Sequence, residues 1–401
     1  EQNIGFHNTL VRLTNQLVFS LYRKPNAEGI VLGKQDYIFE YDYIRQLTGR
    51  DYVGMNFIDE KLRRLKYVQD YLKSTHGIDF VIVFMPGKAS FFKEFIPQKY
   101  QKKNSDSTNY IVYLEEMKKR DIRYVNLNAF FLEFKKDSKY PLFPKYGTHW
   151  SIYGMSQASK VLIDSLESLT GKKFNDYNPD SLYFSTKPLR TDYDGGKALN
   201  LLCNLSKEEF AYPYYQFGDN QDRFKPRVLT IGDSFYWNIF NAEIPKHIFA
   251  NEAFWYYNHK VYPDFYSKPM FTSDLDLKKE VESMDVIMVM VTERFLNIFD
   301  WNLIDQLYYL YTPDYIKNTI YDKTNKIVLD ANWFNKIINE AVASNIKLGD
   351  LLYSNAVDQY YKENKGDFMI EYGPKSYLNY VSNHKGLVEK LEVKALKENK
   401  P

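Results

Sequence analysis

Two short motifs contain the residue types that carry out nucleophilic acyl chemistry. The first is Gly232-Asp233-Ser234, which directly follows a hydrophobic run at 228–231. A serine at the carboxyl end of a parallel strand would lie where open α/β sheets bind their ligands. A helix beginning just after Ser234 would favour developing negative charge, and Gly232 would let the backbone turn sharply. Ser234 is therefore a candidate nucleophile, although serine is also a common helix cap.

The second motif is the segment 147–151, Gly-Thr-His-Trp-Ser, just ahead of a predicted helix. A serine nucleophile needs a base, and histidine is the only side chain that titrates near neutrality without perturbation. Of the six histidines, His149 alone lies at a loop-to-helix junction, where Trp150 and Ser151 follow it. A lone histidine is more often structural, but Ser234 and His149 together could form a catalytic dyad.

Hydrophobic runs that alternate with helical patterns predict an α/β fold, in which helices flank a parallel sheet. Such a sheet would bring the residues that follow its strands to one edge. We expect strands at 79–85, 123–127, 227–231 and 286–291, and helices at 111–119 and 151–169, the latter stopped by Gly171.

The composition excludes several classes of protein. The chain has 401 residues, of which 44% are hydrophobic and 26% charged, as in soluble globular proteins. A net charge of +2 argues against nucleic-acid binding through bulk charge, and an aromatic content of 17% argues against disorder. The single cysteine, Cys203, excludes an intrachain disulfide and a cysteine metal cluster. Because no histidine spacing indicates a metal site either, we expect neither a metal nor a cofactor.

The main domain is expected to cover residues 1–300. Within it, residues 175–224 are rich in Tyr, Asp, Pro and Gly and show weak periodicity. We expect an irregular insertion there, with one short helix around 197–205. It precedes Ser234 in the sequence, so it could form a lid over the site or a plain surface loop.

Residues 301–401 are expected to form a mainly helical C-terminal extension, with the strongest patterns at 333–344 and 351–362. This extension carries no catalytic signature, so we expect a packing role. The longest apolar runs have six residues, too few to span a bilayer. The chain begins at Glu1 rather than at a methionine, and we expect a signal peptide or membrane anchor to precede it.

These motifs resemble the SGNH-hydrolase-like polysaccharide O-acetyltransferases of the AlgX and AlgJ type. The similarity consists of Gly-Asp-Ser at 232–234 after a strand, and of His149-Trp150 followed by Gly154 in a helix. The histidine precedes the serine, as in the permuted arrangement of that group, whereas ordinary SGNH hydrolases have the serine first. The resemblance spans roughly residues 30–300, and its further matches are Gly33-Lys34, Tyr37-Ile38-Phe39, Pro86-Gly87-Lys88 and Glu293-Arg294.

The resemblance implies an exported O-acetyltransferase that carries an acetyl group on Ser234 and passes it to hydroxyls of a cell-surface or secreted polysaccharide. His149 would act as the base. Backbone N–H groups near Ser234, supported by Gly232, Asp233 and Gly87, would stabilise the oxyanion. The resemblance also implies a periplasmic or cell-envelope location, a polysaccharide or oligosaccharide substrate, and a membrane-bound O-acyltransferase as acetyl donor.

One position departs from the family pattern. In the family, an Asp-x-His motif supplies the aspartate that orients the imidazole, and here that position is Gly147. Loss of such an aspartate can cost about 10⁴ in rate in serine proteases. Another carboxylate replaces it, the enzyme works with a dyad, or activity has been lost. Glu293 is the leading replacement because it follows a strand that should end at the same edge, although an ion pair with Arg294 is an equally good explanation.

Three side chains are candidates for substrate binding. Arg294 could hold a carboxylate or ring hydroxyl, or form a structural ion pair. Trp150 and Trp237 flank the proposed dyad and suit a carbohydrate groove, or core packing. Two other functions stay open: a carbohydrate acetylesterase that uses the same Ser and His, with water as acceptor, and a catalytically silent glycan-binding protein, which Gly147 makes credible.

Overall fold

The computed structural model describes residues 6–101, 107–218, 220–264, 268–312 and 319–363. The chain forms two compact units. The first contains the described residues of 6–52 and 61–312, and the second contains those of 53–60 and 319–363.

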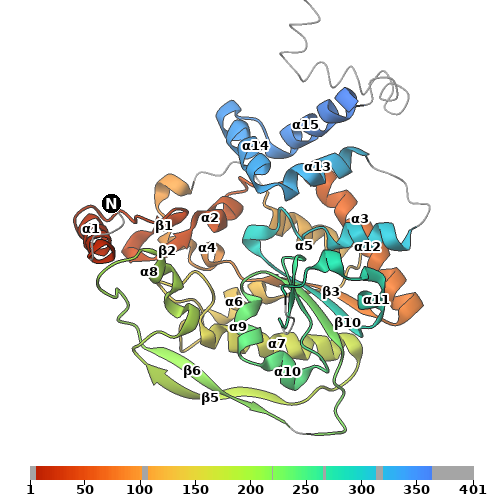
Figure 1. The fold of residues 1–401 in the computed structure, drawn as a ribbon, viewed down its shortest axis with the longest axis horizontal. Helices are drawn as coiled ribbons and strands as arrows, with labels where there is room; N and C mark the ends of the chain where they lie inside the picture. The colour runs from red at the N-terminus through yellow and green to blue at the C-terminus, as the bar shows by residue number, and fades with distance from the viewer. Residues whose placement is uncertain (1–5, 102–106, 219, 265–267, 313–318, 364–401) are drawn as a thin grey trace, which may run out of the picture. The chain divides into compact units, whose positions relative to one another are not determined.

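In the described part of the chain, a six-stranded sheet lies within the first unit (Figure 1). Its first five strands are parallel, and the edge strand β9 runs antiparallel to β8. The predicted α/β architecture is therefore confirmed, with one antiparallel edge strand added. The strand order is β4 (Tyr124–Asn126), β3 (Asp79–Met85), β10 (Val286–Thr292), β7 (Val228–Gly232), β8 (Phe254–Tyr256) and β9 (Lys260–Tyr262).

The central strands β3 and β10 are hydrophobic except for Asp79 at the start of β3 and Thr292 at the end of β10, because both of their faces are covered. All seven residues of each strand are buried, and the two strands pair in parallel from Asp79 and Val286 to Met85 and Thr292. Continuous apolar runs without alternation are typical of parallel strands packed on both sides. The predicted strands at 79–85 and 286–291 are confirmed.

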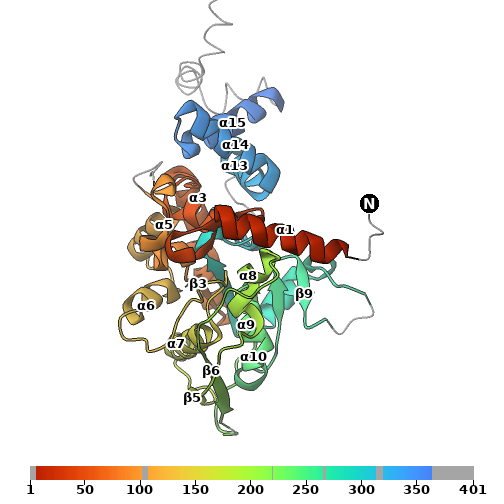
Figure 2. The same ribbon diagram turned by 90° about the vertical axis from the view of Figure 1, so that its left-hand side faces the viewer.

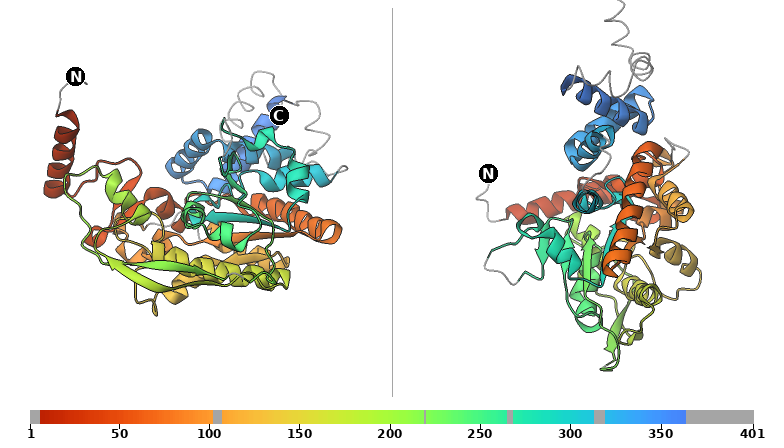
Figure 3. Two further views of the ribbon diagram at one scale, coloured as in Figure 1. Left: turned by 60° about the horizontal axis from the view of Figure 1, so that its bottom comes forward. Right: turned by 90° about the vertical axis from the view of Figure 1, so that its right-hand side faces the viewer.

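Helices cover both faces of the sheet (Figures 1 and 3). Met155 of α7 and Phe131 of α6 join Val83 and Met288 in the core of one face. The helices of the first unit are α1 (His7–Tyr22), α2 (Tyr41–Leu47), α3 (Met55–Tyr71, of which 55–60 belong to the second unit), α4 (Lys88–Phe91), α5 (Asn109–Lys119), α6 (Leu127–Phe134), α7 (Ile152–Thr170), α8 (Asp194–Ala198), α9 (Tyr236–Asn241), α10 (Ile244–Ile248), α11 (Leu277–Glu282) and α12 (Leu303–Tyr311).

Helix α7 carries the expected start and stop signals. The Ser151 hydroxyl caps its first turn by accepting a hydrogen bond from the backbone N–H of Gly154, at 2.8 Å. Gly171 ends the helix in the left-handed conformation, with φ of 68°. The predicted helix at 151–169 is confirmed, and its capped N-terminus fixes the direction of the loop that precedes it.

The segment expected to be an irregular insertion instead contains two long strands, β5 (Tyr177–Ser185) and β6 (Phe210–Phe217), which pair antiparallel beside α7 (Figure 2). Facing aromatic residues such as Tyr183 and Tyr212, whose ring centroids lie 5.4 Å apart, stabilise this pairing. Interspersed Asp and Pro obscured the strand pattern in the sequence. The short helix lies earlier than predicted, as a 3₁₀ turn at Arg190–Tyr193 followed by α8.

The second unit contains the three described helices of the C-terminal region, together with residues 53–60. Within it, Phe57 stacks on Tyr321 with ring centroids 5.1 Å apart. The predicted extension at 301–401 also covers residues 364–401, which lie outside the described residues. In the described ranges, no helix combines the length and apolar character that crossing a bilayer requires. The helices are α13 (Thr319–Leu329), α14 (Ala331–Ser344) and α15 (Leu348–Glu363).

Candidate active site

Ser234 lies directly after β7, at the carboxyl edge of the sheet, and α9 begins two residues later. The turn that presents it is held by the buried side chain of Asp233. One carboxylate oxygen of Asp233 accepts from the backbone N–H of Phe235 at 2.9 Å, and the other accepts from the N–H and hydroxyl of Thr292 at 2.9 and 2.7 Å. Asp233 therefore fixes the serine turn to the end of β10.

The two glycines expected to support the oxyanion differ in their surroundings. Gly232 is a strand residue without a left-handed φ, and a Cβ there would meet its nearest neighbour at 3.4 Å. The sharp turn expected at Gly232 is thus absent. Gly87 follows β3, and a Cβ there would come within 2.1 Å of the Glu293 carboxylate. Glycine at position 87 therefore makes room for Glu293.

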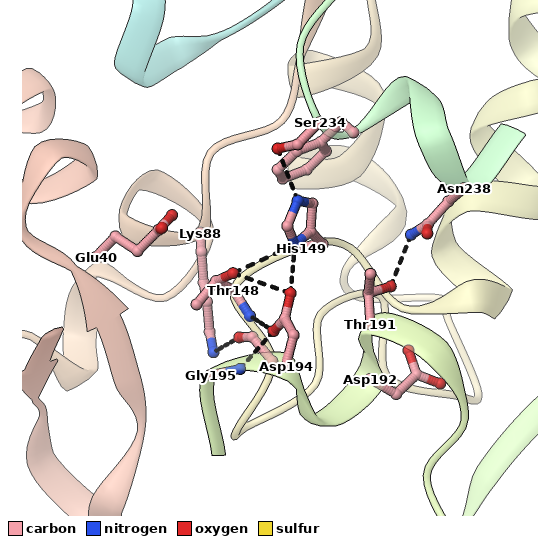
Figure 4. Close-up of polar contacts among 12 residues, drawn as sticks. Glu40, Lys88, Thr148, His149, Thr191, Asp192, Asp194, Gly195, Ser234 and Asn238 are labelled. Atoms are coloured by element: carbon pink, nitrogen blue, oxygen red, sulfur yellow. Dashed lines mark hydrogen bonds and ion pairs between the residues drawn. The ribbon is translucent and has the colours of Figure 1, made fainter. Parts of the chain in front are cut away.

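His149 reaches Ser234 from the loop before α7. Its Nε2 lies 2.8 Å from the Ser234 hydroxyl oxygen, and its Nδ1 contacts the carboxylate of Asp194 (Figure 4). Asp194 assigns the tautomer: Nδ1–H donates to the carboxylate, which leaves Nε2 to accept from the serine hydroxyl. The imidazole also packs against the ring of Phe235, with centroids 4.8 Å apart.

Asp194, the first residue of α8, was missed by the sequence reasoning. Its Oδ1 accepts from the backbone N–H groups of Thr148 and Gly195, each at 2.6 Å, and its side chain is 26% exposed. Burial alone would raise the pKa of Asp194, but the hydrogen bond and charge of His149 and these N–H groups lower it below its usual value. In the sequence, Asp194 stands before Gly195 and Gly196, and this local pattern does not indicate that its side chain lies close to His149.

The surroundings of Gly147 leave no room for an acidic side chain at that position. A Cβ at position 147 would lie 2.3 Å from the Pro144 side chain and 2.8 Å from the backbone oxygen of Thr191. The backbone around Thr191 therefore fills the space that an aspartate at position 147 would need. The segment that contains Thr191 continues to Asp194, whose carboxylate contacts His149.

We call residues 190–196 the acid turn. Asp192 accepts from the backbone N–H of Ile152, the first residue of α7, at 3.1 Å. The side-chain amide of Asn238 in α9 donates to the Thr191 hydroxyl at 2.8 Å. The acid turn is thus bound to the helix that follows His149 and to the helix that follows Ser234.

Glu293, expected to pair with His149, has other partners. Its carboxylate accepts from the hydroxyl of Ser90 and the side-chain amide of Asn128, and the residue is 2% exposed. Burial raises the pKa of Glu293 to about 7, although both hydrogen bonds oppose this shift. The expectation that Glu293 replaces the missing aspartate is wrong, because Asp194 occupies that place.

Arg294 forms a structural ion pair, which the sequence analysis gave as the alternative to substrate binding. Its guanidinium donates to the carboxylate of Glu40 and lies over the ring of Tyr43, 5.4 Å from the centroid. The side chain is 13% exposed. Arg294 is therefore held in place by protein groups at the carboxyl end of β10.

The two tryptophans expected to bind substrate lie in aromatic clusters. Trp150 is fully buried, with its ring centroid 5.2 Å from Phe235, so it offers no face to a sugar and its predicted role is wrong. An aromatic residue beside a motif does not reveal whether its ring faces the core. Trp237 in α9 is partly buried, with edge contacts to Phe254 and Tyr262 at centroid distances of 5.0 and 4.5 Å.

Ser234, His149 and Asp194 thus form a hydrogen-bonded series with the order of a nucleophile, a base and an orienting acid. This constellation suits acyl transfer through a covalent intermediate. Among the residues that the structure describes, no three His, Cys, Asp or Glu side chains form a group that could bind a metal ion.

Residues 30–230 match the protein family described as SGNH hydrolase-like domain, acetyltransferase AlgX. Among solved structures, the O-acetyltransferase domain of Pseudomonas putida AlgJ is similar at 16% identity, over 70% of this chain and 99% of that chain, with a TM-score of 0.45. Pseudomonas aeruginosa AlgX is similar at 14% identity, over 72% of this chain and 69% of that chain, with a TM-score of 0.45. Bacillus cereus PatB1 with a sulfonyl adduct is similar at 11% identity, over 67% of this chain and 97% of that chain, with a TM-score of 0.43. No curated protein matches the sequence.

Proposed function

The chain belongs to the SGNH hydrolase-like acetyltransferase AlgX family, and from this premise we propose that it is a polysaccharide O-acetyltransferase. The acetyl group would pass through Ser234 onto sugar hydroxyls. The observation that carries the proposal is the series formed by Ser234, His149 and Asp194, with 2.8 Å between the serine oxygen and His149 Nε2.

In the first half of the reaction, the Ser234 hydroxyl oxygen forms a bond to the carbonyl carbon of an acetyl donor. At the same time, His149 Nε2 takes the proton of that hydroxyl. The bond from that carbon to the leaving group breaks, and the leaving group takes the proton from His149. Asp194 holds the imidazole in the reactive tautomer and stabilises the imidazolium. The product is acetyl-Ser234.

In the second half, a sugar hydroxyl attacks acetyl-Ser234 while His149 takes its proton. The bond between the acetyl carbon and the serine oxygen then breaks, and the serine regains its proton from His149. Backbone N–H groups near Ser234 and at Gly87 would stabilise the oxyanion of both tetrahedral intermediates. Their position at the carboxyl edge of the sheet supports this assignment.

The donor and the location complete the proposal. By analogy with the family, a membrane-bound O-acyltransferase would supply the acetyl group, and the chain would act as an exported protein in the periplasm or cell envelope. Arg294 and the partly buried Trp237 would lie at the acceptor side of the site. A neighbouring gene for a membrane acyltransferase would support this pairing.

The silent-binder alternative depended on the glycine at position 147. Asp194 provides a carboxylate to His149 in spite of that glycine, which favours catalysis over silent binding. An acetylesterase would use the same acyl-enzyme with water as acceptor, and the two activities differ in how well water is excluded.

The test is the intact-protein mass after incubation with p-nitrophenyl acetate. Wild type should gain one acetyl group, and Ser234→Ala and His149→Ala should gain none. Ser90→Ala is the matched control, because Ser90 also lies at the sheet edge and bonds to a carboxylate, and it should retain the adduct. Acetylation of an added oligosaccharide in excess of acetate release would support the transferase. Release of acetate alone would indicate an esterase, and an unmodified wild type would refute the proposal.

A further inference from the structure

Lys88 is a buried lysine that takes no part in the proton transfers between Ser234 and His149. It is 1% exposed and begins α4, after the central strand β3. Its Nζ donates to the backbone oxygens of Gly147 at 2.6 Å and Lys145 at 2.9 Å. In the described part of the chain, no carboxylate lies within ion-pair distance of it. Burying an ammonium group is costly, and two carbonyl groups compensate less than a carboxylate would.

The Gly147–Thr148 peptide links Lys88 to the proposed catalytic series. Its carbonyl accepts from Lys88, and its N–H, on Thr148, donates to Oδ1 of Asp194 at 2.6 Å (Figure 4). A positive charge at one end of a peptide dipole and a negative charge at the other polarise it in the same direction. The peptide therefore connects an ammonium group to the carboxylate that contacts His149.

We propose that Lys88 is a positioning residue that holds Asp194 against His149 through the Gly147–Thr148 peptide. The proposal rests on the proposed function, because it extends the same series by two members. Lys88 does not reach Ser234. From its position after β3, it holds the Gly147–Thr148 peptide, and that peptide in turn holds Asp194.

Burial lowers the pKa of Lys88 to about 7, so at neutral pH only part of the population carries the ammonium charge. Asp194, Glu208 and Glu40 oppose this shift and favour the charged form, with Asp194 the strongest of the three. The ring of Phe39 covers the ammonium group at 5.7 Å. Asp194 is thus the carboxylate that most strongly stabilises the charge of Lys88, and the charge of Lys88 stabilises ionised Asp194 in return.

The experiment compares Lys88→Met, which removes the charge and the donor, with Lys88→Gln, which removes the charge and keeps an N–H donor on a shorter side chain. Two quantities are measured: the rate of acetyl-Ser234 formation, and the downfield ¹H NMR resonance of the His149 Nδ1 proton. Lys88→Met should lower the rate about 10- to 100-fold, the range found when groups that orient a metal-bound histidine are removed. It should also move the resonance upfield. Lys88→Gln should show smaller changes of the same sign.

The matched control is Lys61→Met, because Lys61 is a fully buried lysine that pairs with Asp300 and Asp305. Its folded fraction should keep the wild-type resonance, since a general loss of stability does not alter the His149–Asp194 contact.

The proposal is overturned if folded Lys88→Met and Lys88→Gln keep the wild-type rate and resonance. It is also overturned if the rate falls only with the unfolded fraction while the resonance stays in place, which would mean a purely structural role. If Lys88→Met does not fold, Lys88→Gln decides by the same criteria. Failure of the proposed function is recognised separately: Ser234→Ala would then acylate like wild type, and the resonance would still report on Lys88.

Discussion

Two carboxylates lie near the carboxyl edge of the sheet, and the structure gives them opposite surroundings. Glu293 follows the central strand β10 directly, whereas Asp194 comes from the segment between β5 and β6. Sequence position favoured Glu293 as the partner of His149, yet Asp194 makes the contact. A position directly after a central strand therefore does not decide which carboxylate contacts the histidine.

The protonation states explain the difference. Glu293 is 2% exposed and its pKa is raised to about 7, so at neutral pH a large share of it is uncharged. Asp194 accepts from backbone N–H groups and has a lowered pKa, so it stays ionised at neutral pH. Only an ionised carboxylate can stabilise an imidazolium. Donors that face the carboxylate, rather than its place in the sheet, suit Asp194 to this task.

Asp194→Asn should have the largest effect on the rate of acetyl-Ser234 formation. The amide would favour the wrong tautomer of His149, and the rate of acetyl-Ser234 formation should fall by about 10³- to 10⁴-fold, as for the equivalent change in a serine protease. The measurement is the release of p-nitrophenol under single-turnover conditions. Glu293→Gln is the paired control, and equal losses in both variants would contradict the distinction between the two acids.

Gly147→Asp should have the next largest effect. The new side chain would meet the backbone oxygen of Thr191, push the acid turn away and displace Asp194. A misplacement near 1 Å can cost about 100-fold in rate, and overpacking typically costs about 1–3 kcal/mol of stability. Acylation rate and thermal unfolding measure the two losses. Adding Asp194→Ala should not restore activity, and recovery in that double variant would show that position 147 can still hold the acid.

Asn238→Ala should weaken the anchoring of the acid turn without removing the acid. It deletes one neutral hydrogen bond to Thr191, which contributes about 1 kcal/mol, so a loss of about fivefold in acylation rate is expected. A double-mutant cycle with Thr191→Val isolates the pair. Strictly additive effects of the two substitutions on the rate would argue that this contact does not position Asp194.

Glu293→Gln should change the acylation rate least, by less than about threefold, since the amide keeps most of the local hydrogen bonds. Its effect should appear in stability. The folded-state pKa of Glu293 is above its unfolded value, so its favourable contribution is complete below about pH 4.5 and is lost as pH rises through about 7. The free energy of unfolding of wild type should therefore fall by roughly 2–4 kcal/mol more than that of the variant between these limits. Parallel pH profiles from chemical denaturation would contradict the assigned burial effect.

The strands that position the site could be predicted because burial on both faces leaves a strong pattern. The residues at 80–85 and 286–291 are all apolar, and no helix amphipathicity competes with the prediction of strands there. Ser234 and His149 could be found for a related reason, since each lies at the border of a predictable element. The two motifs together suggested a dyad, and the order of the histidine before the serine then agreed with the family resemblance.

The acid could not be predicted in the same way. Asp194 is 45 residues from His149 and lies in a segment whose aromatic strands were obscured by Asp and Pro. Its role depends on a long-range approach of two loops, and no local periodicity records such an approach. The buried face of Trp150 is a similar case, because the direction of a ring is set by packing rather than by sequence spacing.

The glycine at position 147 has a consequence for how genomes are interpreted. A search that requires Asp-x-His would classify this chain, and any relative with the same replacement, as a pseudoenzyme. The structure supports a different rule, in which an aspartate at position 147 and an acid turn that closes over that position exclude each other sterically. A relative with glycine at this position should therefore be searched for an aspartate in the acid turn before it is classified as inactive.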